Sequence, residues 1–74
     1  MILIWGDFNN LDIERRVRLN SARSLVDLEA LGDQLKDGLL VTVSDGDYQA
    51  DGHLEFSGGI WRATVDWTTG KDVS

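Results

Sequence analysis

The stretch Trp61-Arg62-Ala63-Thr64-Val65-Asp66-Trp67 decides the fold class, because its side chains alternate between apolar and polar. Alternation with period two is typical of a strand that has one face against a core and the other against water. The expected inner face carries Trp61, Ala63, Val65 and Trp67, and the outer face carries Arg62, Thr64 and Asp66. The sequence therefore predicts a half-buried strand here and a fold built mainly from β-structure.

Four other segments also have strand character. They are the apolar run 1–5 and the segments 11–20, 39–44 and 52–56. In 11–20 the apolar side chains keep the same phase, which predicts an inner face interrupted only by Arg15 and composed of Leu11, Ile13, Val17 and Leu19.

Turn-forming residues separate these strands. Glycine, aspartate and asparagine at 6–10 predict a hairpin that joins the first two strands. Asp45-Gly46-Asp47, Asp51-Gly52 and Ser57-Gly58-Gly59 predict the later turns.

One short helix is predicted between the second and third strands. Leu25, Leu28 and Leu31 recur at helical spacing, which places them on one face. Ser24 is expected to cap the start of the helix, and Gly32 is expected to end it in a left-handed conformation.

This element order predicts a mainly β (α+β) fold. We expect a small, partly open, five-stranded barrel or a coiled antiparallel sheet, with one short helix between strands 2 and 3. A chain of 74 residues is sufficient for one domain, expected over 1–69, with a frayed polar tail at 70–74.

Composition narrows the class of protein. The chain has seven basic and thirteen acidic residues, hence a formal net charge of −6. It has no cysteine, which excludes disulfides and thiolate zinc sites. It has neither a secretory signal nor an apolar run of about 20 residues, so we expect a cytoplasmic protein without membrane association.

No catalytic, metal or cofactor site is predicted. His53 is the only histidine, and no nucleophile with an orienting group surrounds it in a recognisable frame, so we expect an exposed histidine in a turn. The acidic run at 45–51 fails as a calcium loop, because Ala50 and Phe56 stand where glycine and glutamate are required. The chain also has no glycine-rich phosphate loop.

The aromatic residues allow two interpretations. Trp61 and Trp67 are in phase and about 20 Å apart along an extended strand, so both can complete a thin core. Alternatively, an exposed Trp67 together with Tyr48 anchors a partner, because aromatic side chains dominate the energetics of protein interfaces.

The arginines also leave two interpretations open. Arg15, Arg16, Arg18 and Arg23 lie within nine positions. They either lie along one strand and form ion pairs with nearby acidic side chains, or form a basic strip that binds phosphate groups. The acidic net charge weighs against nucleic-acid binding.

Half of the chain resembles known small barrels. Residues 36–45, 52–56 and 61–67 resemble the meander of Src-homology (SH3-like), Tudor-type and KOW-type barrels. This resemblance implies a recognition module for peptides, modified side chains or RNA.

The chain is also similar to a group of short, acidic, uncharacterised bacterial proteins. The residues that carry this similarity are Arg16-Val17-Arg18-Leu19-Asn20, Ser24-Leu25-x-x-Leu28 and Trp61-x-Ala63-x-Val65-Asp66-Trp67. The similarity implies a compact bacterial domain and no particular activity.

We therefore predict a non-enzymatic protein-binding or accessory module that uses an acidic, tryptophan-bearing surface. The expected partner is a protein with a basic surface, and an edge strand is a possible homodimer seam. The alternative is a nucleic-acid-associated barrel that uses the strip of four arginines. The predicted binding residues are Trp67, Tyr48, Trp61, Asp66, Arg16 and Arg18, with no cofactor.

Overall fold

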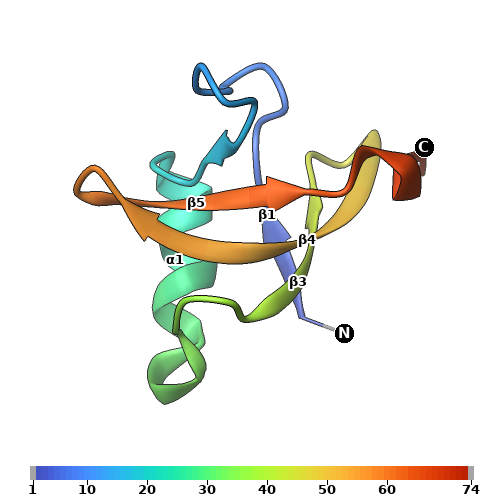
Figure 1. Ribbon diagram of the computed structural model, residues 1–74. Coiled ribbons are helices and arrows are strands. Elements are labelled where there is room, and N and C mark those ends of the chain that lie inside the picture. Colours follow the sequence, from blue (N-terminus) through green and yellow to red (C-terminus); the bar gives the residue numbers. More distant parts are fainter. Residues whose placement is uncertain (1, 74) are drawn as a thin grey trace.

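A computed structural model describes residues 2–73, and its main element is a curled, mixed β-sheet that forms a half-barrel with one helix (Figure 1). The strands run in the order β1-β3-β4-β5-β2, and β6 pairs with β4 beside this path. The elements are β1 (Leu3–Trp5), β2 (Val17–Arg18), α1 (Ala22–Ala30), the 3₁₀ turn η1 (Gly32–Gln34), β3 (Leu40–Ser44), β4 (Tyr48–Ser57), β5 (Ile60–Val65), the 3₁₀ turn η2 (Trp67–Thr69) and β6 (Lys71–Asp72).

The predicted mainly β fold, with a curled five-stranded sheet and one helix after the second strand, is confirmed. The predicted hairpin between the first two strands is wrong. Instead, β1 pairs with β3 in parallel, and β2 pairs with β5 at the opposite edge. Gly6 does not turn the chain back, because its N–H donates to the Ser44 carbonyl and extends the pairing with β3.

The predicted strand over 11–20 is interrupted by a tight turn. The Asp12 carboxylate accepts hydrogen bonds from the N–H groups of Glu14 and Arg16, and Arg15 adopts a positive φ of 64°. Ile13, expected on the inner face, is therefore 99% exposed. An aspartate that binds the backbone two residues ahead favours a turn, and this preference outweighs the strand pattern.

Helix α1 begins three residues earlier than predicted. Ser21 caps the helix by accepting a hydrogen bond from the Ser24 N–H, whereas Ser24 is fully buried. Leu28 is buried as expected, but Leu25 is 52% exposed. Gly32 has the predicted left-handed conformation, with a φ of 54°.

The helix covers the free edge of β1. The Ser24 hydroxyl donates to the Trp5 carbonyl at 2.5 Å, and the Trp5 N–H donates to Asp27 at 2.7 Å. Side chains of α1 therefore satisfy backbone groups that an edge strand otherwise exposes to pairing with another chain.

Strand β4 passes through the predicted turn at Asp51-Gly52 without interruption, so His53 lies in a strand rather than in a turn. Gly52 permits a close approach of β5, since a Cβ at this position would overlap the Thr64 carbonyl oxygen. This contact explains why a glycine stands in the middle of the longest strand.

The core lies on the inner face of the half-barrel. Its buried apolar residues are Ile4, Val17, Leu19, Leu28, Val41, Val43, Ala50, Leu54, Ala63 and Val65. The segment expected to be a polar tail contains β6, whose Lys71 and Asp72 pair with Gln49 and Tyr48.

Candidate functional site

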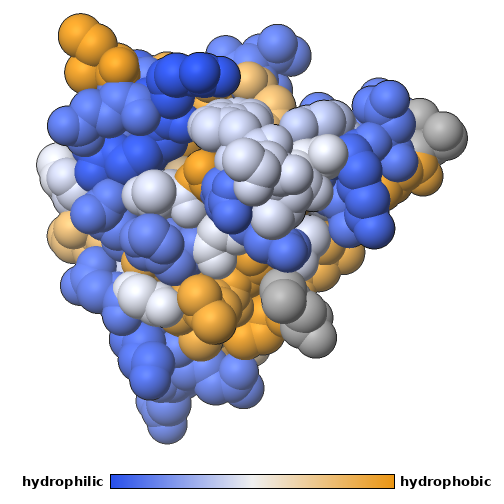
Figure 2. Space-filling model, turned by 45° about the vertical axis from the view of Figure 1, so that its right-hand side comes forward, coloured by the Kyte–Doolittle hydropathy of each residue, from blue (hydrophilic) through white to orange (hydrophobic). Residues whose placement is uncertain are grey.

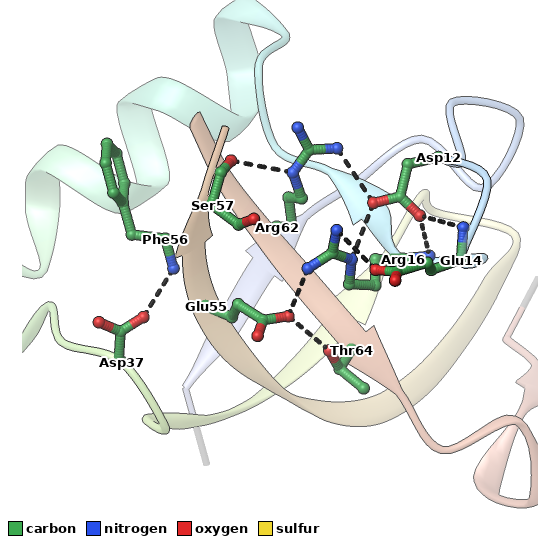
Figure 3. Close-up of polar contacts among 9 residues, drawn as sticks. All are labelled: Asp12, Glu14, Arg16, Asp37, Glu55, Phe56, Ser57, Arg62 and Thr64. Atoms are coloured by element: carbon green, nitrogen blue, oxygen red, sulfur yellow. Dashed lines mark hydrogen bonds and ion pairs between the residues drawn. The ribbon is translucent and has the colours of Figure 1, made fainter. Parts of the chain in front are cut away.

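Charged side chains on the outer face form an ion-pair network at the β2 side of the sheet (Figure 3). Asp12, whose side chain is 6% exposed, accepts hydrogen bonds from Arg16 Nε at 2.8 Å and Arg62 Nη1 at 3.0 Å. Arg16 also contacts Glu55 and Glu14, each at 2.8 Å. The network ties the turn at 12–16 to β4 and β5.

The network shifts the pKa values of its members. Burial raises the pKa of the Asp12 carboxyl, but hydrogen bonds from Arg16, Glu14 and Arg62 outweigh burial and lower it to about 2. The hydrogen bond from Arg16 also lowers the pKa of Glu55, and the same bond raises the pKa of Arg16. These charges therefore support the fold.

The four arginines of the predicted strip have separate surroundings. Arg16 belongs to the ion-pair network. Arg15 lies over the Trp67 ring at 5.2 Å and Arg23 over the Trp5 ring at 4.7 Å. Arg18 is half-buried and lies opposite Arg62 of β5. The structure thus engages three of the four with carboxylates or aromatic rings.

The predicted aromatic residues fall into two groups. Tyr48 and Trp67 both pack edge-on against Phe8, with ring centroids 5.2 and 5.8 Å apart. Trp61 instead packs against Phe56 at 5.3 Å. Trp67 is half-buried and lies in η2, just beyond the strand in which it was predicted. Phe8 was missed, since a single aromatic residue in a loop carries no periodic signal.

Carboxylates gather where the β3–β4 turn, η2 and β6 meet, and we call this region the acidic end. Its members are Asp45, Asp47, Asp51, Asp66 and Asp72. Backbone hydrogen bonds connect the elements, since Asp66 N–H donates to the Asp51 carbonyl and Val73 N–H to the Asp47 carbonyl. Within residues 2–73, none of these five carboxylates forms an ion pair.

A shallow groove of about 340 Å³ adjoins the acidic end on the outer face. Its lining comprises Leu40, Asp51, Gly52, His53, Thr64, Val65 and Asp66. The strand register places these residues together, since His53 pairs with both Leu40 and Thr64.

Exposed apolar side chains continue the surface beside the groove. Leu40 is 68% exposed and Leu3 is 61% exposed. Figure 2 shows orange, hydrophobic surface on the lower part of this face, where β1 and the start of β3 run in Figure 1. The groove therefore combines carboxylates with apolar walls.

Of the predicted binding residues, Asp66, Tyr48 and Trp67 lie in or next to the acidic end, whereas Trp61, Arg16 and Arg18 lie elsewhere. The groove also contains Asp51, His53 and Leu40, which were not among the predicted binding residues. The alternation that continues through β3 and β4 places all three on the outer face, but the assignment of Asp51-Gly52 to a turn concealed this phase.

The part of the chain from 2 to 73 holds no group of three or more histidine, aspartate or glutamate side chains arranged to bind a metal ion. It also has no helix with the length and apolar character needed to cross a membrane.

No family model, curated protein or solved structure matches the chain. The resemblances to small recognition barrels and to short acidic bacterial proteins remain predictions.

Proposed function

We propose that this protein is a non-enzymatic binding module whose acidic end takes up a basic segment of another protein. The observation that carries this proposal is a set of five carboxylates that form no ion pair within residues 2–73, two of which line a groove with an apolar wall. The field of such a surface attracts a positively charged partner and repels nucleic acid.

The contrast with the rest of the outer face supports this assignment. At the β2 side, Asp12, Glu14 and Glu55 are held by arginines of the same chain. At the acidic end, the basic side chains are fewer: β4, η2 and β6 contain His53 and Lys71, and Arg15 lies over the Trp67 ring of η2. The excess negative charge there is available to a second molecule.

Apolar contact provides the second component of binding. Leu40 is exposed in the groove, Leu3 is exposed on the neighbouring strand β1, and Trp67 is partly buried beyond Asp66. An electrostatic attraction that brings the partner in, followed by burial of these side chains, gives fast association and slow dissociation. Action in the cytoplasm and dimerisation through an edge strand stay predictions from the sequence.

Capture from a lysate of the source cell tests the proposal with two matched charge variants. Asp47→Lys/Asp72→Lys reverses two charges at the acidic end, and Glu29→Lys/Asp33→Lys reverses two around the end of α1. The two pairs of substitutions lie far apart, because Figure 1 shows the turn that follows α1 and the C-terminal end of the chain at opposite sides of the molecule. Since each reversal adds two charges, both variants change the net charge from −6 to −2.

We expect the wild type and Glu29→Lys/Asp33→Lys to retain the same basic protein at low salt and to release it as salt rises. Asp47→Lys/Asp72→Lys is expected to retain about tenfold less, because it loses two favourable charges at the contact. Equal retention by both variants contradicts the proposal. Nuclease-sensitive nucleic acid as the only retained species contradicts it as well.

A further inference from the structure

We propose that the groove formed by β3, β4, β5 and Asp66 is a subsite for an arginine side chain of the basic partner. This inference rests on the proposed function and specifies the side chain that the outer face recognises. It depends on how the two carboxylates of the groove are held and on what lies between them.

In both carboxylates, one oxygen accepts hydrogen bonds from the fold and the other is left as an acceptor for a ligand. Asp51 Oδ1 accepts a hydrogen bond from the Thr42 hydroxyl at 2.9 Å. Asp66 Oδ1 accepts from the Thr68 N–H at 3.1 Å and from its hydroxyl at 2.6 Å. The Oδ2 atom of each accepts no hydrogen bond from residues 2–73. Each side chain is thus oriented by the fold and keeps an acceptor for a ligand.

The backbone segments that carry the two carboxylates are also hydrogen-bonded to each other. The Asp66 N–H donates to the Asp51 carbonyl at 2.8 Å, and the Asp51 N–H donates to Thr69 Oγ1 at 2.8 Å. These bonds attach η2 to β4 through both its N-cap, Asp66, and its last residue, Thr69. A site whose acceptors are already oriented loses less entropy when a ligand binds.

The remaining lining suits the rest of an arginine side chain. The exposed Leu40 side chain and the backbone at Gly52 provide an apolar surface for the methylene stem. His53 provides a ring on which a planar guanidinium can stack, and the Thr64 hydroxyl adds a polar group. The five N–H donors of a guanidinium fan out in one plane and can serve two carboxylates, whereas the lysine ammonium is a compact point charge.

The test uses ¹⁵N-labelled full-length protein titrated at low salt with N-acetyl-arginine methylamide and, separately, with the lysine analogue. We expect saturable shifts centred on Gly52, His53 and Thr64–Asp66, with arginine binding more tightly than lysine. The variant Asp51→Asn/Asp66→Asn keeps acceptors for Thr42 and Thr68 but removes both charges. It is expected to weaken arginine binding about tenfold or more, since charged hydrogen bonds are lost.

Two further variants keep the test decisive. Asp33→Asn removes an exposed carboxylate at η1 and is expected to leave the shifts unchanged. Leu40→Ala removes an exposed apolar wall and is expected to weaken binding by a smaller factor. A spectrum that stays dispersed shows that each variant is folded.

Equal affinity for arginine and lysine, or unchanged binding by Asp51→Asn/Asp66→Asn, overturns the arginine subsite. If the groove shows no shifts while partner capture still depends on Asp47 and Asp72, the subsite is wrong and the proposed function stands. If the arginine analogue binds in the groove but both charge-reversal variants capture the same proteins, the proposed function fails instead.

Discussion

The two faces of β4 and β5 are made by alternate residues of the same strands, but they differ in burial and polarity. On the inner face, Leu54, Ala63 and Val65 are buried in the apolar core. On the outer face, Glu55, Arg62 and Thr64 lie in a polar layer. The inner face provides most of the stability, because burial of apolar area is the main favourable contribution to folding.

The outer face itself divides into two parts. At the β2 side, acids and arginines pair with each other and hold the turn at 12–16 (Figure 3). At the acidic end, Asp51 and Asp66 are oriented by hydroxyl groups and form no ion pair with residues 2–73. The same residue types therefore support the fold in one place and leave a charged surface in the other. Substitutions on the two faces should accordingly separate stability from binding.

The largest loss of stability is expected from Gly52→Ala. The new Cβ would overlap the Thr64 carbonyl oxygen, so β4 and β5 must move apart. We expect the free energy of unfolding in urea to fall by about 4 kcal/mol or more. The control Gly46→Ala has open space around its Cβ but a φ of 94°, and is expected to lose about 1 kcal/mol. Equal losses would mean that the close approach at Gly52 is unimportant.

Leu54→Ala and Leu40→Ala compare the two faces directly. Leu54 is fully buried, so its truncation leaves a cavity and is expected to lower the free energy of unfolding by about 3 kcal/mol. Leu40 is 68% exposed, and its truncation should change that free energy by less than about 0.5 kcal/mol. If both variants lose a similar free energy of unfolding in urea, the division between a buried inner face and a solvent-exposed outer face is contradicted.

Acid should weaken the ion-pair network specifically. The pKa of Asp12 is lowered from 3.8 to about 2 in the folded protein, so the unfolded chain binds more protons between these values. The stabilisation by Asp12 is therefore complete above about pH 4 and is lost as the pH falls towards 2. The lowered pKa of Glu55 acts in the same direction.

The variant Asp12→Asn lacks this titration. Between pH 4 and 2, we expect the slope of its free energy of unfolding against pH to be smaller than that of the wild type. The difference in slope should correspond to the uptake of up to about one proton on unfolding. The two curves converge as the pH falls. Urea denaturation of the wild type and of Asp12→Asn at several pH values measures this difference. A parallel curve for Asp12→Asn would show that the network does not lower the pKa of this carboxyl.

The smallest change in stability is expected at the acidic end. Asp51→Asn/Asp66→Asn keeps the acceptors for Thr42 and Thr68, so the free energy of unfolding should change by less than about 1 kcal/mol. A larger loss in urea denaturation would assign these carboxylates to the support of the fold, as at the β2 side.

Local patterns predicted much of the fold. The alternation at 61–65 specified β5, and the spacing of Leu28 and Gly32 located the helix and its end. The partners of β1 and β2 could not be derived, because pairing across 39 or more residues depends on which edges meet in space. At 11–16 the apolar alternation is genuine, but Asp12 and the positive φ of Arg15 convert it into a turn.

The candidate site was predictable only in part. The acidic character and Asp66 followed from composition and from the strand at 61–67. The meeting of Asp51 and Asp66 depends on the register of β4 against β5 and on the hydrogen bonds that fasten η2 to β4. Likewise, the contacts of Arg62 and Arg16 with Asp12 and Glu55 join residues up to 50 positions apart, which no local pattern reveals.

The most direct test of the central claim is partner retention by the folded variant Asp51→Asn/Asp66→Asn. The wild type and Asp33→Asn serve as references on parallel columns loaded with the same lysate of the source cell. We predict that the basic protein retained by both references is lost from this variant, although its urea unfolding curve is close to that of the wild type. Retention of the same protein in the same amount by all three forms, and by Asp47→Lys/Asp72→Lys as well, would contradict the claim that the acidic end is the binding surface.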